Sequence, residues 1–376
     1  ISLPENYNGL GYSNLIFLVL KVVSFIEKFK KAKAVDKAEF LTILIEEPEA
    51  HLHPQMQQVF IKQIKELIKE SNISIQLIIS SHSSHIITEA GIDLEKGFDR
   101  IRYFSNYKGK IEVNDFNNFK IGTEEKNEKE TFRFLKQYLN LHKCDIFFAD
   151  KVIMVEGVTE KMLLPIMINK EAKSLNNEYI SVLEVGGNYT HKFKELLHFI
   201  KVKTLIITDI DSVDPTNKRK SCRTNTENAV TCNSTLKNWL PKMESISDLN
   251  NCKEEIKIED CLIRVTYQIK ESEENEYVAR SLEESIINKN LDFFKNTFKI
   301  INSDEETTVT VKSKFELLKN EDLSDPDIYE LSPNSNEKSQ FTFDLMTFDE
   351  ETTKLKWEVP LYIKEGLEWL AKNDNI

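Results

Sequence analysis

Three acidic residues follow two apolar segments of the chain, where their carboxylates could bind metal ions. Glu156 comes directly after the apolar run 152–155, and Asp209 and Asp211 come directly after the run 203–208. Converging carboxylates repel one another unless cations lie between them, and hard oxygen ligands favour Mg²⁺ or Mn²⁺. One such acid alone is more simply explained as a helix N-cap or loop residue. Acids at two strand ends instead predict a metal site.

A second acid strengthens this prediction. Glu160 follows Glu156 by four positions, which on a helix places both side chains on one face and allows a second cation. Gly157 lets the backbone turn closely beneath the predicted site. Further along, ARSLEES at 279–285 places acids at the entry of a predicted helix, and EKSQF at 337–341 precedes an apolar stretch.

The segments that must position these residues alternate between strand and helix. Apolar runs at 151–155, 179–187, 203–208 and 262–268 predict strands, and the amphipathic segments between the first three predict helices. Such alternation predicts a parallel, doubly wound α/β sheet, whose strands present their carboxyl ends at one edge. Glu156, Asp209 and Asp211 would then meet at that edge.

The first hundred residues contain a second group of chemically suggestive side chains. Glu46 and Glu47 end a predicted strand at 41–45, and His82 follows another at 75–79. Acids at such a strand end can orient Mg²⁺ and polarise the water that attacks a phosphate, although a solvated strand end explains them as well. A glycine-rich helix start, at 9–13, is a natural anion site.

This group resembles the C-terminal lobe of ABC-type ATPases of the SMC and RecF kind. The resemblance implies that ATP is closed between two protomers by these residues: Gly9, Gly11 and Ser13 of the signature motif, Glu46 and Glu47 of Walker B, the D-loop 48–52 and the switch histidine His82. No GxxxxGK[ST] phosphate-binding loop occurs in the sequence. We therefore expect that the P-loop part of the ATPase is absent and that this chain does not hydrolyse ATP alone.

The strand–EG and strand–DxD pair resembles the Toprim fold over roughly residues 148–300. With RSLEE, KSQF and the closing PLYIKEGLEWL in order, the chain is similar to the OLD (overcoming lysogenization defect) nucleases, which join an ABC ATPase to a Toprim domain; the Gabija nuclease is a relative. The resemblance implies an ABC ATPase lobe over 1–120, a helical linker over 121–147 and a Toprim domain with a C-terminal helical extension over 148–376. Its parallel sheet would be flanked by helices.

The resemblance further implies a DNA endonuclease that uses two Mg²⁺ or Mn²⁺ ions to hydrolyse phosphodiesters. The implied ligands are Glu156, Glu160, Asp209, Asp211 and Glu283, with Ser281 and Thr208 as further options. Lys338 would be the cation beside the scissile phosphate, and Lys312, in a similar KSxF pattern, competes for that role. ATP in the complete ATPase, a homodimer or higher homo-oligomer, a helicase-like partner and a role in anti-phage defence or DNA processing are implied by analogy.

Composition limits these interpretations. The net charge of −12 argues against a uniformly basic DNA-binding surface, but leaves room for a local patch at Lys218, Arg219, Lys220 and Arg223, which a solvated loop would explain equally well. Five cysteines without a CxxC pair favour a reduced, cytoplasmic protein, and no apolar run reaches the roughly 18–20 residues of a membrane span. The alternative function is a non-catalytic, ATP-gated DNA-binding or repair protein of the SMC/RecF type with a scaffold Toprim domain, which would have no use for clustered carboxylates.

Overall fold

The computed structural model describes residues 9–32, 38–92, 97–107, 109–121, 125–141, 144–294, 327–334, 336–351 and 356–372. The chain forms two compact units. The first comprises Ile1–Asn106 and Lys110–Phe148, and the second comprises Tyr107–Gly109 and Ala149–Ile376. The segment expected to link two domains, 121–147, falls within the first unit, and its role as a linker stays a prediction.

The first unit contains two predicted strands, which pair in parallel. Its helices and strands are α1 (Leu10–Lys31), β1 (Leu41–Glu46), α2 (Pro54–Glu70), β2 (Ile75–Ser80), α3 (Ser84–Ala90), β3 (Arg102–Tyr107), β4 (Lys110–Asp115) and α4 (Glu125–Leu141), with 3₁₀ turns at Phe116–Asn118 and Asp145–Phe147. The pairing of β1 with β2 runs from Leu41 opposite Ile75 to Glu46 opposite Ser80. The shared carboxyl ends of these strands therefore lie together, as the alternating pattern predicted.

Helix α1 is more apolar than the sequence reading indicated. An 18-residue stretch within it has a mean hydropathy of 1.6 and is 17% buried in the structure. By length and composition this helix is long and apolar enough to cross a membrane, although no unbroken apolar run reveals it. One such helix is weak evidence, because helices that pack in a protein core pass the same test, and Leu15, Val22 and Ile26 of α1 do pack in the core of the first unit.

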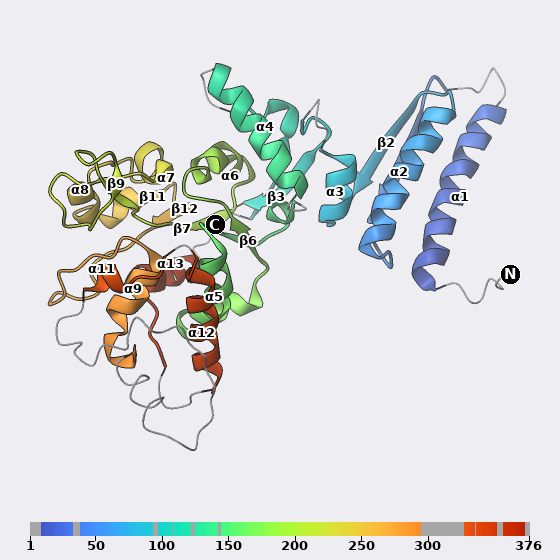
Figure 1. Cartoon of the computed structure of the whole chain (residues 1–376). Coiled ribbons are helices and arrows are strands. Elements are labelled where there is room, and N and C mark those ends of the chain that lie inside the picture. Colours follow the sequence, from blue (N-terminus) through green and yellow to red (C-terminus); the bar gives the residue numbers. More distant parts are fainter. Residues whose placement is uncertain are drawn as a thin grey trace. The chain divides into compact units, whose positions relative to one another are not determined.

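The second unit is an α/β domain built around a five-stranded sheet (Figure 1). Its helices and strands are β5 (Lys151–Val155), α5 (Val158–Glu171), β6 (Ile180–Glu184), α6 (Lys194–Ile200), β7 (Lys203–Ile207), β8 (Ser212–Asp214), β9 (Lys220–Ser221), β10 (Val230–Thr231), α7 (Ser234–Asn238), α8 (Ile246–Asn250), β11 (Ile258–Glu259), β12 (Ile263–Thr266), α9 (Leu282–Lys289), α11 (Ile328–Leu331), α12 (Lys338–Glu351) and α13 (Leu361–Ala371), with 3₁₀ turns at Lys173–Asn177, Thr190–Phe193 and Glu254–Lys257.

The strand order of this sheet is β11-β12-β7-β5-β6. The four strands predicted from apolar runs are all present and pair in parallel, and the short β11 adds an antiparallel edge. Every residue of β5 and β7 is buried. Strands covered on both faces need apolar side chains in both directions, which explains why 152–155 in β5 and 205–207 in β7 are continuous apolar runs without alternation.

Helices cover both faces of the sheet (Figure 1). Helices α5, α12 and α13 pack together on one face, where Ile153 and Leu205 join their core, and α6 lies across the sheet from them. Helix α13 comes especially close, because a Cβ built on Gly366 would lie 3.0 Å from the side chain of Leu205 and 3.1 Å from that of Thr266. These two layers of helices hold β5 and β7 side by side. The predicted acids Glu156 and Asp209 follow the carboxyl ends of these two strands.

Candidate metal centre

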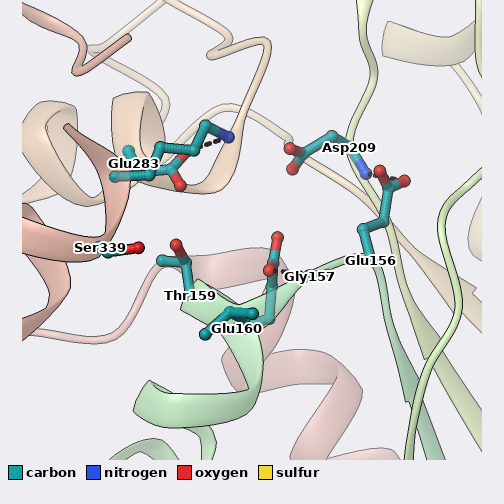
Figure 2. A pocket seen from close by; sticks show the side chains of 9 residues that line it. Glu156, Gly157, Thr159, Glu160, Asp209, Glu283 and Ser339 are labelled. Atoms are coloured by element: carbon teal, nitrogen blue, oxygen red, sulfur yellow. Dashed lines mark hydrogen bonds and ion pairs between the residues drawn. The ribbon is translucent and has the colours of Figure 1, made fainter. Parts of the chain in front are cut away.

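A pocket of about 310 Å³ lies where β5 and β7 end. Figure 2 shows Glu156, Glu160, Asp209 and Glu283 around it, which follow β5, begin α5, follow β7 and begin α9. The residues that line it are Glu156, Gly157, Val158, Thr159, Glu160, Asp209, Glu283, Lys338 and Ser339. Five predicted site residues are thereby brought together, although almost two hundred positions separate the first from the last.

Glu156 is held at the end of β5 by neighbours from β7 and beyond. Its Oε1 accepts hydrogen bonds from the Thr208 hydroxyl, from the main-chain N–H of Asp209 at 2.9 Å and from the Asn233 amide at 2.8 Å. Burial and the nearby charge of Asp211 nevertheless raise the pKa of Glu156 to about 7. Hydrogen bonds therefore hold the carboxylate in place, while burial and the charge of Asp211 disfavour its ionised form.

Glu160 lies in the first turn of α5 and is only 7% exposed. Its Oε2 accepts from the main-chain N–H of Gly157 at 3.1 Å, which caps the helix start. Burial, followed by the charge of Glu283, raises the pKa of Glu160 to about 7. Helical spacing does not relate Glu160 to Glu156, because α5 begins at Val158 and Glu156 precedes its N-cap, Gly157. Both acids nevertheless line the pocket, and burial disfavours the charged form of each.

Asp209 follows β7 and is 6% exposed. Its Oδ1 accepts from the Gln268 side-chain amide at 2.6 Å. Burial, and then the charges of Glu156 and Glu160, raise the pKa of Asp209 well above its ordinary value. Because each acid here makes its neighbours harder to ionise, the cluster would be stabilised by cations.

Glu283 and Lys338 form the opposite wall of the pocket. Glu283, in the first turn of α9, is 0% exposed, and neither of its carboxylate oxygens has a well-oriented hydrogen-bond donor within the described residues. The Nζ of Lys338 lies 2.9 Å from its Oε2. Burial lowers the pKa of Lys338, but Glu283, Asp209 and Glu160 outweigh it and raise that pKa, so the lysine is charged.

The donor set fits divalent cations in its chemistry. Three carboxylates with raised pKa values, those of Glu156, Glu160 and Asp209, and the fully buried carboxylate of Glu283 form the oxygen-rich environment that Mg²⁺ and Mn²⁺ prefer. Among the described residues, no three His, Cys, Asp or Glu side chains are already converged around one point as metal ligands. Ion binding would therefore draw these carboxylates closer than they stand in this structure.

The remaining predicted ligands occupy different positions. Asp211 does not line the pocket; its backbone is left-handed (φ 50°), and its carboxylate lies 3.3 Å from the Arg280 guanidinium. Thr208 donates to Glu156, and the Ser281 hydroxyl accepts from a backbone N–H as the N-cap of α9. Lys312 lies outside the described residues.

The predicted basic patch follows β8 in an exposed loop. Lys218 and Arg219 have left-handed backbones, and Arg219 lies 3.7 Å from Glu244. Arg223 is engaged elsewhere, because it pairs with Asp327 and lies over the Tyr329 ring. Any role of this loop in binding DNA stays a prediction.

In the first unit, the parallel pairing of β1 with β2 brings the two predicted strand ends together. His82 Nε2 lies 3.1 Å from Glu47 Oε1. Glu49, which lies within the predicted D-loop 48–52, accepts hydrogen bonds from the Ser81 hydroxyl at 2.9 Å and from the main-chain N–H of His82 at 2.5 Å. Glu46 ends β1.

The predicted signature residues lie at the start of α1. Gly9 is the residue before α1, and Ser13 lies in its first turn. A Cβ at Gly11 would clash with the main-chain oxygen of His51, so glycine is needed for α1 to pass over this turn.

Three residues beside the acids of the candidate metal centre were not predicted from the sequence. Asn233 and Gln268 hold Glu156 and Asp209, and Gly187 gives them room. The Gly186–Gly187 pair after a strand and an asparagine before a short helix are common in loops, so neither pattern alone indicates a contact with the acids.

Comparisons with known proteins place this geometry in context. Residues 147–211 match a family model described as "Overcoming lysogenization defect protein-like, TOPRIM domain", and residues 1–87 match one described as "AAA ATPase domain". Endonuclease GajA of Bacillus cereus (strain HuB5-5) is 33% identical over 99% of this chain and 54% of its own length. The chain thus spans about half of that relative.

More distant relatives agree. The Old nuclease of Escherichia phage P2 is 24% identical over 55% of this chain and 34% of its own length. The OLD nuclease of Thermus scotoductus is 24% identical over 50% of this chain and 32% of its own length. Among solved structures, the C-terminal region of the Burkholderia pseudomallei OLD protein aligns over 60% of this chain and 98% of its own, with 19% identity and a TM-score of 0.33.

Proposed function

Because this chain belongs to the OLD-like proteins, with an ATPase segment followed by a Toprim domain, we propose that it acts as a divalent-metal-dependent DNA endonuclease coupled to an ABC-type ATPase module. One observation carries the proposal. Four carboxylates, three of them buried, and one lysine meet in a single pocket at the edge of the sheet. An assembly of like charges that lowers the stability of the fold is more easily explained by a reaction than by a scaffold.

Each residue has a role in this proposal. Glu156, Glu160, Asp209 and Glu283 would hold two Mg²⁺ or Mn²⁺ ions, with Asp211 at the periphery of the site. Bound ions of this kind activate a water molecule and stabilise the oxygen that leaves the phosphorus. The Lys338 side chain, 36% exposed and positively charged, would donate to a non-bridging phosphate oxygen and offset the charge that develops there.

The wider partners follow from the family. The Glu47–His82 pair and the start of α1 would contribute to ATP binding in the complete ATPase, which would form a homodimer or higher homo-oligomer. Lys218 and Lys220 would contact the DNA backbone. We place the protein in the cytoplasm, in anti-phage defence or DNA processing and in association with a helicase-like partner, by analogy with the family.

Nicking of supercoiled plasmid DNA tests the proposal. We expect nicking with Mg²⁺ or Mn²⁺ and none with EDTA, and we expect Glu160→Gln and Asp209→Asn to lower the rate by at least about 100-fold, since each removes a ligand charge at nearly constant volume. Glu271→Gln is the matched control, because Glu271 is a buried acid that pairs with Lys289 away from the pocket. If both pocket variants nick as fast as the wild type, the scaffold alternative is favoured and the proposal is wrong.

A further inference from the structure

A buried side-chain amide connects the two strands that carry the acids. Asn233 is 2% exposed, and its Nδ2 lies 2.8 Å from Glu156 Oε1, 2.7 Å from Thr208 Oγ1 and 2.8 Å from the main-chain oxygen of Asp209. This one nitrogen therefore contacts the residue after β5 and two residues after β7. The hydrogen bonds that Glu156 accepts from described residues all reach Oε1, and none of them reaches Oε2.

The orientation of this amide is set by the helix that follows it. Asn233 Oδ1 accepts from the main-chain N–H of Thr235 at 2.9 Å and of Leu236 at 3.4 Å, as the N-cap of α7. Because the amide oxygen faces two donors, its nitrogen must face the acceptors on Glu156 and Thr208. Helix α7 thus fixes which end of Asn233 meets the acid.

The chain after β6 is shaped to admit this contact. A Cβ built on Gly187 would lie 2.5 Å from Asn233 Nδ2 and would also clash with Glu156 Oε1. The main-chain oxygen of Gly187 accepts from both the N–H and the hydroxyl of Thr235, at 3.1 and 2.7 Å. Gly187 is therefore pressed against the amide and the acid together, with no room for a side chain.

A second amide holds the second acid. Gln268 is 0% exposed and donates to Asp209 Oδ1 at 2.6 Å. Its Oε1 accepts from the main-chain N–H of Ile210 at 2.9 Å, and its Nε2 also lies 3.2 Å from the Tyr362 hydroxyl. Like Asn233, it engages one carboxylate oxygen and is itself fixed at its other end.

We infer that Asn233 and Gln268 are positioning residues, which hold Glu156 and Asp209 with one oxygen each engaged and the other available to a divalent cation. The inference rests on the proposed metal site. Amides suit this role because they donate hydrogen bonds without bringing a positive charge that would compete with the ion. Outer partners of this kind typically change metal affinity by about 10- to 100-fold when they are removed.

The test measures Mn²⁺ binding directly, by electron paramagnetic resonance of free Mn²⁺, and does not depend on cleavage. Asn233→Ser keeps an N-cap acceptor for α7 and removes the amide that reaches Glu156. Asn290→Ser is the control, because Asn290 is also a buried amide and donates at 2.9 Å to the main-chain oxygens of Ile286 and Glu358, away from the pocket. Thermal unfolding in EDTA reports the structural cost of each variant.

We expect Asn233→Ser to weaken Mn²⁺ binding by about 10- to 100-fold and Asn290→Ser to leave it unchanged. Nicking by Asn233→Ser should recover as Mn²⁺ is raised, because the ligands themselves remain. Wild-type Mn²⁺ affinity in Asn233→Ser would overturn the inference. If Glu156→Gln also binds Mn²⁺ as the wild type does, the proposed metal site is wrong as well, so the two failures are distinguishable.

Two further variants keep the test decisive should Asn233→Ser unfold. Gly187→Ala changes no polar group but presses a methyl group against both the Asn233 amide and Glu156 Oε1, which disturbs their contact, and Gln268→Met removes the donor to Asp209 at similar volume. Both should weaken Mn²⁺ binding in the same direction. Unchanged affinity in both variants, with the fold intact, would overturn the inference.

Discussion

Glu160→Gln should make the metal-free protein more stable at pH 8, although it removes a proposed metal ligand. Glu160 is 7% exposed, and burial followed by the charge of Glu283 raises its pKa from 4.5 to about 7. Between pH 4.5 and about pH 7, Glu160 is therefore protonated in the folded state and ionised in the unfolded state. The contribution of Glu160 to stability is fully present below pH 4.5 and is lost as the pH rises to about 7.

The size of the effect follows from the same two values. A difference of about 2.5 pH units, at about 1.36 kcal/mol per unit, corresponds to about 3 kcal/mol of lost stability above pH 7. Glutamine stays neutral at every pH and can still accept the N–H of Gly157, as in other capping boxes. We thus expect Glu160→Gln to be up to about 3 kcal/mol more stable at pH 8 and within about 1 kcal/mol of the wild type at pH 5.

Urea unfolding in EDTA, followed by tryptophan fluorescence, measures this difference. All three tryptophans, Trp239, Trp357 and Trp369, lie in the second unit, so the signal reports the domain that contains the pocket. Saturating Mg²⁺ should stabilise the wild type and have much less effect on the variant. A variant that is less stable than the wild type at pH 8 without metal would refute the reasoning.

Three other substitutions test the role of Lys338, the basic patch and the packing of the sheet. Lys338→Met should abolish nicking while Mn²⁺ binds at least as tightly, because Glu283 loses its cation; wild-type nicking would count against the role of Lys338. Replacing Lys218 and Lys220 with glutamine should reduce the salt slope of DNA binding, measured by fluorescence anisotropy, by about 2, and an unchanged slope would exclude this loop. Leu205→Ala, in the 0% exposed centre of β7, should cost about 2–5 kcal/mol in urea unfolding; a cost below about 1 kcal/mol would mean that the core is packed differently.

The strands could be predicted because burial on both faces leaves little choice of residue. Val152 to Val155 is apolar throughout, and the acid that follows marks where the strand leaves the core. The same logic located Asp209 after β7. Glu160 was expected to share a helix face with Glu156, but α5 begins at Val158, so both acids line the pocket although Glu156 precedes the helix.

The rest depended on contacts that local patterns do not encode. Asp211 was expected to meet Glu156 and Asp209 at the sheet edge, but the left-handed backbone at Asp211 turns its carboxylate toward Arg280. Asn233 and Gln268 reach the acids only because the sheet order places their segments there. The positions of Glu283 and Lys338 were inferred from the family and not from any spacing.

Anomalous diffraction from crystals soaked in Mn²⁺ tests the central claim most directly. We expect two Mn²⁺ peaks in the pocket at the ends of β5 and β7, with ligands drawn from Glu156, Glu160, Asp209 and Glu283. We also expect Glu283 to bind one of these ions, so that Lys338 is no longer the only positive charge that offsets its carboxylate. Peaks that lie elsewhere, or a pocket without Mn²⁺ at saturating concentration, would contradict the assignment of this cluster as a metal-dependent nuclease centre.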